Sequence, residues 1–206
     1  MSMLTALHEQ RLLAVCQALK RSQARLVLDL GCGSGALTTL LLNDPGFEAI
    51  LAMDRSSAAL AALRQNLAPD LAPDRRLTLV HGSWTEVHAP CRNYQAAALV
   101  ETIEHLDPRD LSRMENTVFS AYDLDCIVVT TPNGDYNALL GLGPGQFRDP
   151  DHRFEWPRVK FRKWCRGLAA RHGYQVGFGD IGDQDPELGA PTQMAVFSRA
   201  SSASAT

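Results

Sequence analysis

Two glutamates and a histidine lie within five positions in the segment "VETIEHLDP", residues 100–108. In a helical turn, positions i, i+3 and i+4 share one face, with Cβ atoms about 5–6 Å apart. Glu101, Glu104 and His105 would then lie close enough to bind one ion. Their types and spacing predict a metal site, whereas a surface turn with solvated glutamates is the alternative interpretation.

A glycine-rich loop is the second candidate site. The segment "VLDLGCGSG" places Gly31, Gly33 and Gly35 directly after an apolar run. Glycines at the carboxyl end of a strand let the backbone approach a ligand closely. The third glycine comes one residue too early for a dinucleotide pattern, and Asp29 precedes the first by two residues. Asp54 ends the next apolar run about 20 residues on, where a carboxylate can accept hydrogen bonds from both hydroxyls of a ribose.

Apolar runs and helical periodicity alternate along the chain. We expect helices at 4–20, 36–44, 56–68, 108–122 and 157–173, and strands at 25–30, 48–54, 75–83, 94–100, 125–132, 174–182 and 192–198. Strands without polar alternation favour a parallel sheet covered on both faces. The last two strands have no helix between them and would pair antiparallel. The predicted fold class is α/β: a doubly wound, Rossmann-like sheet, mostly parallel, with an antiparallel C-terminal edge strand pair.

The composition indicates one globular domain. The chain has 206 residues, of which 45% are hydrophobic and 21% charged. No apolar run approaches the roughly 18 residues of a membrane span, and the N-terminus does not read as a secretory signal, so we expect a cytoplasmic protein without membrane contact. Five scattered cysteines without a C-x-x-C pair predict reduced thiols. We expect a catalytic domain over residues 1–198 and a disordered tail at 199–206.

The charge is uneven along the sequence. The net charge is -3, yet residues 152–172 hold seven Lys or Arg against one Glu. A solvated amphipathic helix is one interpretation of this basic stretch. The other is a local phosphate-binding patch, with contacts from some of Arg158, Lys160, Arg162 and Lys163.

The glycine loop together with Asp54 resembles that of the S-adenosylmethionine-dependent methyltransferases of the doubly wound class. In that class the loop packs on the methionine portion of the donor, and the acid after the second strand binds the ribose. The resemblance implies S-adenosylmethionine as the cofactor and a methyltransferase sheet. The cofactor-binding residues that it implies are Asp29, Gly31, Gly33, Gly35, Asp54 and Ser83.

Three motifs in order make the resemblance more specific. They are E-x-x-E-H at 101–105, T-P-N-x-[DE]-Y-N at 131–137 and D-H-[KR]-F-E-W at 151–156. They resemble the small-RNA 3′-terminal 2′-O-methyltransferases of the Hua-enhancer type, including bacterial RNA-repair relatives, over about residues 8–197. The resemblance implies that four residues bind one divalent ion and carry the catalysis: Glu101, Glu104, His105 and His152.

This resemblance implies an RNA 3′ end with free 2′ and 3′ hydroxyls as substrate. Two imidazole ligands favour Mn²⁺, with Mg²⁺ possible. A ribose 2′-hydroxyl holds its proton tightly, so a Lewis acid or a base must assist; His105 is the candidate base. An RNA-repair ligase or kinase is the implied partner, and we expect a monomer. Because bacterial relatives carry an N-terminal half, the chain is either an excised domain or a short member.

Two departures from the family pattern bear on the acceptor side. The chain reads "MLTALHEQR" where members carry prolines, and Asp149 with Pro150 replaces a more basic pair. Asn133 and Tyr136 are expected to shape the acceptor pocket or to cap a loop. Phe154 and Trp156 either pack in the core or stack on a terminal base.

Two other functions remain open from the sequence. One is a metal-free methyltransferase that acts on a small molecule or a protein and uses the acidic cluster as an ordinary polar pocket. The other is a non-catalytic module that binds RNA ends.

Overall fold

The computed structural model describes residues 3–67 and 75–199. Within these ranges one sheet contains seven strands: β1 (Leu26–Leu30), β2 (Ala49–Asp54), β3 (Leu77–His81), β4 (Ala96–Val100), β5 (Cys126–Pro132), β6 (Tyr174–Ile181) and β7 (Thr192–Arg199). The α-helices of the same ranges are α1 (Met3–Arg21), α2 (Ala36–Leu42), α3 (Ser57–Asn66), α4 (Leu111–Glu115) and α5 (Arg158–His172).

The strand order is β3-β2-β1-β4-β5-β7-β6. Strands β1 to β5 pair in parallel, and β7 lies antiparallel between β5 and β6. The predicted α/β class and its antiparallel C-terminal pair are therefore confirmed. The chain order reverses beside β1, whose neighbours are β2 and β4. In open α/β sheets ligands bind outside the carboxyl ends of the strands at such a point.

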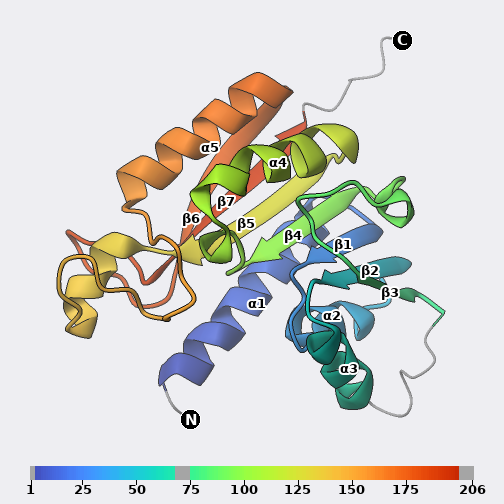
Figure 1. The fold of residues 1–206 in the computed structure, drawn as a ribbon, viewed down its shortest axis with the longest axis horizontal. Coiled ribbons are helices and arrows are strands. Elements are labelled where there is room, and N and C mark those ends of the chain that lie inside the picture. The colour runs from blue at the N-terminus through green and yellow to red at the C-terminus, as the bar shows by residue number, and fades with distance from the viewer. Residues whose placement is uncertain (1–2, 68–74, 200–206) are drawn as a thin grey trace.

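Two cores cover the two faces of the sheet, because successive strand residues point to opposite sides. Val27 and Ile50 face a cluster with residues of α1, α2 and α3. Leu28 and Leu51 face the other cluster, with residues of α4 and α5. Figure 1 shows α4 and α5 together in its upper part and α1 to α3 in its lower part. The carboxyl ends of β1, β2, β4 and β5 are thus held by packing on both sides.

The expected helix at 108–122 is not one regular helix. A 3₁₀ turn (Pro108–Asp110) precedes α4, and a π-helical segment (Asn116–Ala121) follows it. In this last segment the Tyr122 N–H donates to the Thr117 carbonyl at 3.2 Å, five residues back. Apolar periodicity indicates a helical face, but it does not distinguish these hydrogen-bond patterns.

Three further expectations concern the cysteines, membrane contact and the C-terminal tail. All five cysteines are free and buried. None of the helices in the described ranges combines the length and apolar composition needed to cross a membrane. Arg199 ends β7, and the rest of the predicted tail lies outside the described residues.

Candidate functional site

The backbone turns sharply where β4 ends. Glu101 has φ +50°, in the left-handed region, which costs a non-glycine residue about 1–2 kcal/mol. Its N–H donates to the Thr130 carbonyl of β5 at 3.1 Å, which fixes this conformation. The chain then enters a 3₁₀ turn (Ile103–His105) instead of continuing the strand. This turn carries Glu104 and His105 to the carboxyl edge of the sheet.

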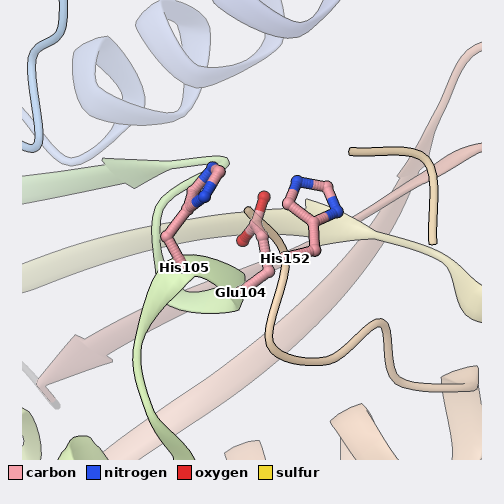
Figure 2. A group of neighbouring side chains, drawn as sticks. All are labelled: Glu104, His105 and His152. Carbon is pink, nitrogen blue, oxygen red and sulfur yellow. The ribbon is translucent and has the colours of Figure 1, made fainter. Parts of the chain in front are cut away.

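Glu104, His105 and His152 form a cluster at this edge. One possible ligand atom from each lies within 4.8 Å of the others. Figure 2 shows the Glu104 carboxylate between the two imidazole rings, whose centroids are 4.8 Å apart. Glu104 is fully buried, and its Oε2 accepts a hydrogen bond from Thr131 at 2.9 Å. Its Oε1 has no hydrogen-bond partner among the described residues, as expected for an oxygen that binds a cation.

Glu101, the fourth predicted ligand, is not in the group of three. Its Oε2 lies 3.2 Å from Nη2 of Arg11, which reaches it from α1. Its Oε1 is buried and, within the described ranges, has no hydrogen-bond partner. The structure therefore brings three predicted ligands together and holds Glu101 beside them in an ion pair. Coordination by Glu101 stays a prediction.

The ionisation of the cluster suits a cation. Burial and the neighbouring Glu101 charge raise the pKa of Glu104 well above its usual value. Burial also raises the pKa of Glu101, although Arg11 opposes this. Burial and the His152 ring lower the pKa of His105, which favours the neutral imidazole that binds metals. Two buried acids without full compensation and a neutral imidazole fit a divalent ion.

The His152 loop is tied to the β4 turn over a long sequence distance. The Arg153 N–H donates to the Glu104 carbonyl at 2.7 Å, and His152 Nδ1 lies 2.5 Å from Glu155 Oε1. Burial opposes ionisation of Glu155, yet its hydrogen bonds outweigh burial and lower its pKa. Glu155 was not predicted as a site residue. The signal for it in the sequence is a carboxylate three residues after a candidate histidine ligand.

The glycine-loop cavity has a volume of about 330 Å³. Four of the six predicted cofactor-binding residues line it: Gly31, Gly33, Asp54 and Ser83. The same cavity is also lined by Arg55, Trp84, Glu101, Thr102, His105, Leu106 and Asp151. Trp84 was not predicted as a site residue, although it directly follows Ser83. The cavity thus joins the glycine loop to the metal-site candidates.

Asp54 organises the wall of this cavity. Its Oδ2 accepts a hydrogen bond from the Gly33 N–H at 2.9 Å, and its Oδ1 accepts one from the Ser56 N–H at 2.8 Å. Gly31 has φ +81°, and a Cβ there would lie 2.4 Å from Cγ2 of Thr102. The close packing of the glycine loop on the β4 turn therefore requires glycine at this position.

The other two predicted cofactor-binding residues, Asp29 and Gly35, do not line the cavity. Asp29 is 2% exposed, and its Oδ2 accepts a hydrogen bond from Thr38 of α2 at 2.6 Å. A Cβ at Gly35 would lie 2.0 Å from a methyl group of Leu63. Both residues therefore hold the conformation of the loop and do not face the cavity.

A second cavity, which we call the α1 cavity, lies on the other side of the cluster and has a volume of about 360 Å³. Its lining consists of Ala6, Leu7, Gln10, Arg11, Glu101, Pro132, Tyr136, Leu140, Arg148, Asp149, His152, Gly182, Asp183 and Pro191. Glu101 lines both cavities. His105 faces the glycine-loop cavity and His152 faces the α1 cavity. The cluster therefore lies where two ligand-sized spaces meet.

The remaining predicted residues divide into loop supports and core residues. Asn133 is fully buried, and its Nδ2 donates to the Leu188 and Ala190 carbonyls, whereas Tyr136 lines the α1 cavity. Phe154 and Trp156 are each 6% exposed and stack with centroids 4.3 Å apart. The core interpretation of these two aromatics is confirmed, and stacking on a terminal base is wrong because the rings are buried against each other.

The basic stretch lies mainly on α5 and has partners within the protein. Arg158 Nε is 3.5 Å from Asp135, and the Arg162 guanidinium lies 5.4 Å from the centroid of Phe178. Lys160 lies 5.0 Å from the Trp156 ring. Lys163 is exposed. The start of α5, rather than its whole length, adjoins the loops of the site (Figure 1).

Comparisons with known proteins agree with the fold. A family model for a methyltransferase domain matches residues 27–122. The crystal structure of the methyltransferase domain of bacterial CtHen1 is 39% identical, with a TM-score of 0.84, covering 93% of this chain and 99% of that chain. The crystal structure of the small RNA methyltransferase HEN1 is 31% identical, with a TM-score of 0.87, over 97% of this chain and 27% of that chain.

A curated relative is similar over the same region. The small RNA 2′-O-methyltransferase of Mus musculus is 32% identical over 203 residues, which are 94% of this chain. The chain spans about half the length of the curated relatives it matches, 51% in the mouse protein.

Proposed function

The chain belongs to the Hua-enhancer family of small-RNA 2′-O-methyltransferases, and we propose that it methylates the 2′-hydroxyl of the 3′-terminal ribose of an RNA. S-Adenosylmethionine is the proposed donor, and one divalent ion is required. The relatives' names support the reaction class. The residues that we assign to the ion are Glu101, Glu104, His105 and His152.

The position of the cluster between the two cavities carries this proposal. A methyl transfer needs a donor and an acceptor that approach each other in line, with water excluded. The glycine-loop cavity has the residues for the donor, and the α1 cavity opens on the opposite side of Glu101. A purely structural ion would not need to lie between two cavities.

We assign the donor to the glycine-loop cavity. Gly31 and Gly33 permit close backbone approach, and Asp54 lies where a ribose would be bound. When bound, S-adenosylmethionine supplies an electrophilic methyl group on a positively charged sulfur. The Trp84 ring, 8% exposed, forms part of the wall and limits water beside the donor.

The metal ligands would act on the acceptor. When bound, a divalent ion supplies Lewis acidity that lowers the pKa of a nearby hydroxyl. Glu104 would offer its unpartnered Oε1 to such an ion, and His105 and His152 would each supply an imidazole nitrogen. This mixed oxygen and nitrogen ligand set favours Mn²⁺ over Mg²⁺. The carboxylates of Glu101 and Glu104 would balance the charge of such an ion.

The proposal is tested with tritiated S-adenosylmethionine, Mn²⁺ and three short RNAs of one sequence. One RNA ends in 2′ and 3′ hydroxyls, one in a 2′-deoxyribose and one in a 3′-phosphate. We expect label only on the first, with resistance of its end to periodate, which cleaves a free diol. Label on the deoxy RNA would contradict methylation of the terminal 2′-hydroxyl, and label on the phosphate RNA would contradict a requirement for both free hydroxyls. No label on any RNA would contradict an RNA substrate.

Several finer predictions accompany this function. An RNA-repair ligase or kinase partner, a monomeric state and a cytoplasmic location stay predictions from the sequence. The metal-free alternative is less consistent with the buried, unpartnered oxygens of Glu101 and Glu104, since an ordinary polar pocket would hydrogen-bond them.

A further inference from the structure

A second carboxylate lies behind the cluster. The side chain of Glu155 is fully buried. Its Oε1 is 2.5 Å from His152 Nδ1 and also accepts a hydrogen bond from the Arg148 N–H at 2.7 Å. Its Oε2 accepts a hydrogen bond from Asn137 Nδ2 at 2.6 Å. Both oxygens are therefore occupied by donors within the protein, and Glu155 can reach an ion only through His152.

The hydrogen bond to Glu155 determines which nitrogen of His152 faces the cluster. A carboxylate oxygen accepts, so Nδ1 carries the proton, and in the neutral ring the lone pair is then on Nε2. Figure 2 shows one ring nitrogen of His152 turned toward Glu104 and the other turned away. Because Nδ1 is bonded to Glu155, the nitrogen turned toward Glu104 is Nε2.

The loop around Glu155 is built to hold it in place. Arg148 lies along the same carboxylate, with Nε 3.7 Å from Glu155 Oε2. The same Nε donates to Asn137 Oδ1 at 2.7 Å, and Nη1 and Nη2 donate to the Pro191 and Asn133 carbonyls. The hydrogen bonds thus connect His152 and Glu155 to the ends of β5 and β7. A side chain on a surface loop would lack these restraints.

We propose that Glu155 is a positioning residue that fixes the Nδ1–H tautomer and the ring orientation of His152, so that Nε2 is presented to the ion. This inference rests on the metal site of the proposed function. Partners behind a metal-binding histidine commonly fix its tautomer, and their loss typically lowers metal affinity about 10–100-fold. The sequence motif D-H-R-F-E-W then contains both the ligand and the residue that orients it.

The tautomer is measured first, by ¹⁵N NMR of the histidine rings in metal-free wild-type protein, with Mn²⁺ affinity measured separately by titration. His152 is assigned by its loss in His152→Gln. We expect Nδ1–H for His152 in the wild type. In Glu155→Gln the neutral amide should weaken this preference and raise the Mn²⁺ dissociation constant about 10–100-fold. The affinity for S-adenosylmethionine, measured without Mn²⁺, should change less than about twofold, a result that a merely structural role for Glu155 would not give.

Glu115→Gln is the matched control. Glu115 also accepts from a histidine, His172 Nε2 at 2.8 Å, and from Arg171 Nε at 2.6 Å, but it lines neither cavity. We expect this variant to keep the wild-type Mn²⁺ affinity.

The outcomes separate the inference from the function on which it rests. An Nε2–H tautomer of His152 in the wild type would overturn the role of Glu155 even if the variants failed to fold. Equal Mn²⁺ affinity in wild type and Glu155→Gln would overturn that role and leave the metal site intact. No Mn²⁺ binding by the wild type would overturn the metal site itself, and the role of Glu155 with it.

Discussion

Glu104 is fully buried, and Glu101, three residues before it at the end of β4, has a side chain that is 19% exposed. Each has one oxygen bonded within the protein and one without a partner among the described residues. Leaving buried polar atoms unpaired costs about 1–3 kcal/mol each. The proposed cation would give both of these oxygens a partner.

Asp29 provides a pH test at the residue scale. Burial raises its pKa to about 6 from an ordinary 3.8, although hydrogen bonds from Thr38 oppose this. Because the folded-state pKa is the higher one, the folded state loses stability as pH rises through this interval. Asp29→Asn stays neutral and avoids the loss. Relative to the wild type, the free energy of unfolding of Asp29→Asn should therefore rise by about 2–3 kcal/mol between pH 4 and pH 7, as measured by urea denaturation.

The control for Asp29 is Asp125→Asn, at an exposed position. Its difference from the wild type should stay nearly constant over the same interval. If the difference in unfolding free energy between Asp29→Asn and the wild type stays constant, or falls with rising pH, burial does not raise the pKa of the Asp29 carboxyl.

At the scale of elements, α1 is joined to the sheet through the site. Arg11 Nη2 contacts both Glu101, after β4, and Thr192 Oγ1, at the start of β7, at 3.2 Å and 3.0 Å. The side chains of Arg11 and Glu101 are only 12% and 19% exposed. The ion pair therefore fixes two side chains in the wall of the α1 cavity, and one of them, Glu101, is a candidate metal ligand.

A double-mutant cycle tests this connection in metal-free protein. We expect Arg11→Met to lower the free energy of unfolding by about 2–4 kcal/mol, since it leaves the largely buried Glu101 carboxylate without its cation. Glu101→Gln should lower it less, because the neutral amide loses the charge pairing but avoids the cost of a buried charge. The double variant should lose less than the sum, by about 1–3 kcal/mol. Chemical denaturation of the four proteins measures these values. Additive losses would mean that the two side chains do not stabilise each other.

Structural features were predicted from the sequence only where the interactions that form them are local in the sequence. Strands such as β4 and β5 were predicted because apolar runs are local signals. The sequence did not predict the left-handed backbone of Glu101 or the hydrogen bond from the Arg153 N–H to the Glu104 carbonyl. Both depend on contacts between segments that are distant in the sequence. Glu155 was missed for the same reason: its role appears only when His152, Asn137 and Arg148 lie around it.

At the scale of the whole molecule, an acidic protein is proposed to bind an RNA end. The net charge is -3, and several basic residues of α5 have partners, including Arg162, 3.9 Å from Asp180. Only a few phosphates can then be contacted. The sequence predicted the concentration of positive charge, but not the pairing, which requires β6 to lie beside α5.

Salt dependence of RNA binding measures these contacts. For single strands, the slope of log K against log salt is about -0.7 per phosphate contacted. With four contacts or fewer, we expect a slope no steeper than about -3. Lys160→Gln/Lys163→Gln should reduce its magnitude by about 1.4. Lys20→Gln, at the opposite edge of the sheet beside Asp44, is the control and should leave it unchanged. An unchanged slope in the double variant would remove α5 from the RNA path.

Metal-dependent methylation is tested most directly by label transfer to a diol-ended RNA, in EDTA and in Mn²⁺, for wild type, Glu104→Ala and the exposed control Glu86→Ala. We predict transfer by the wild type and the control only with Mn²⁺, and at least about a 100-fold loss in Glu104→Ala, because its carboxylate is the most buried candidate ligand. Transfer that persists in EDTA, or that Glu104→Ala retains at the wild-type rate, would contradict a metal-dependent reaction at this cluster.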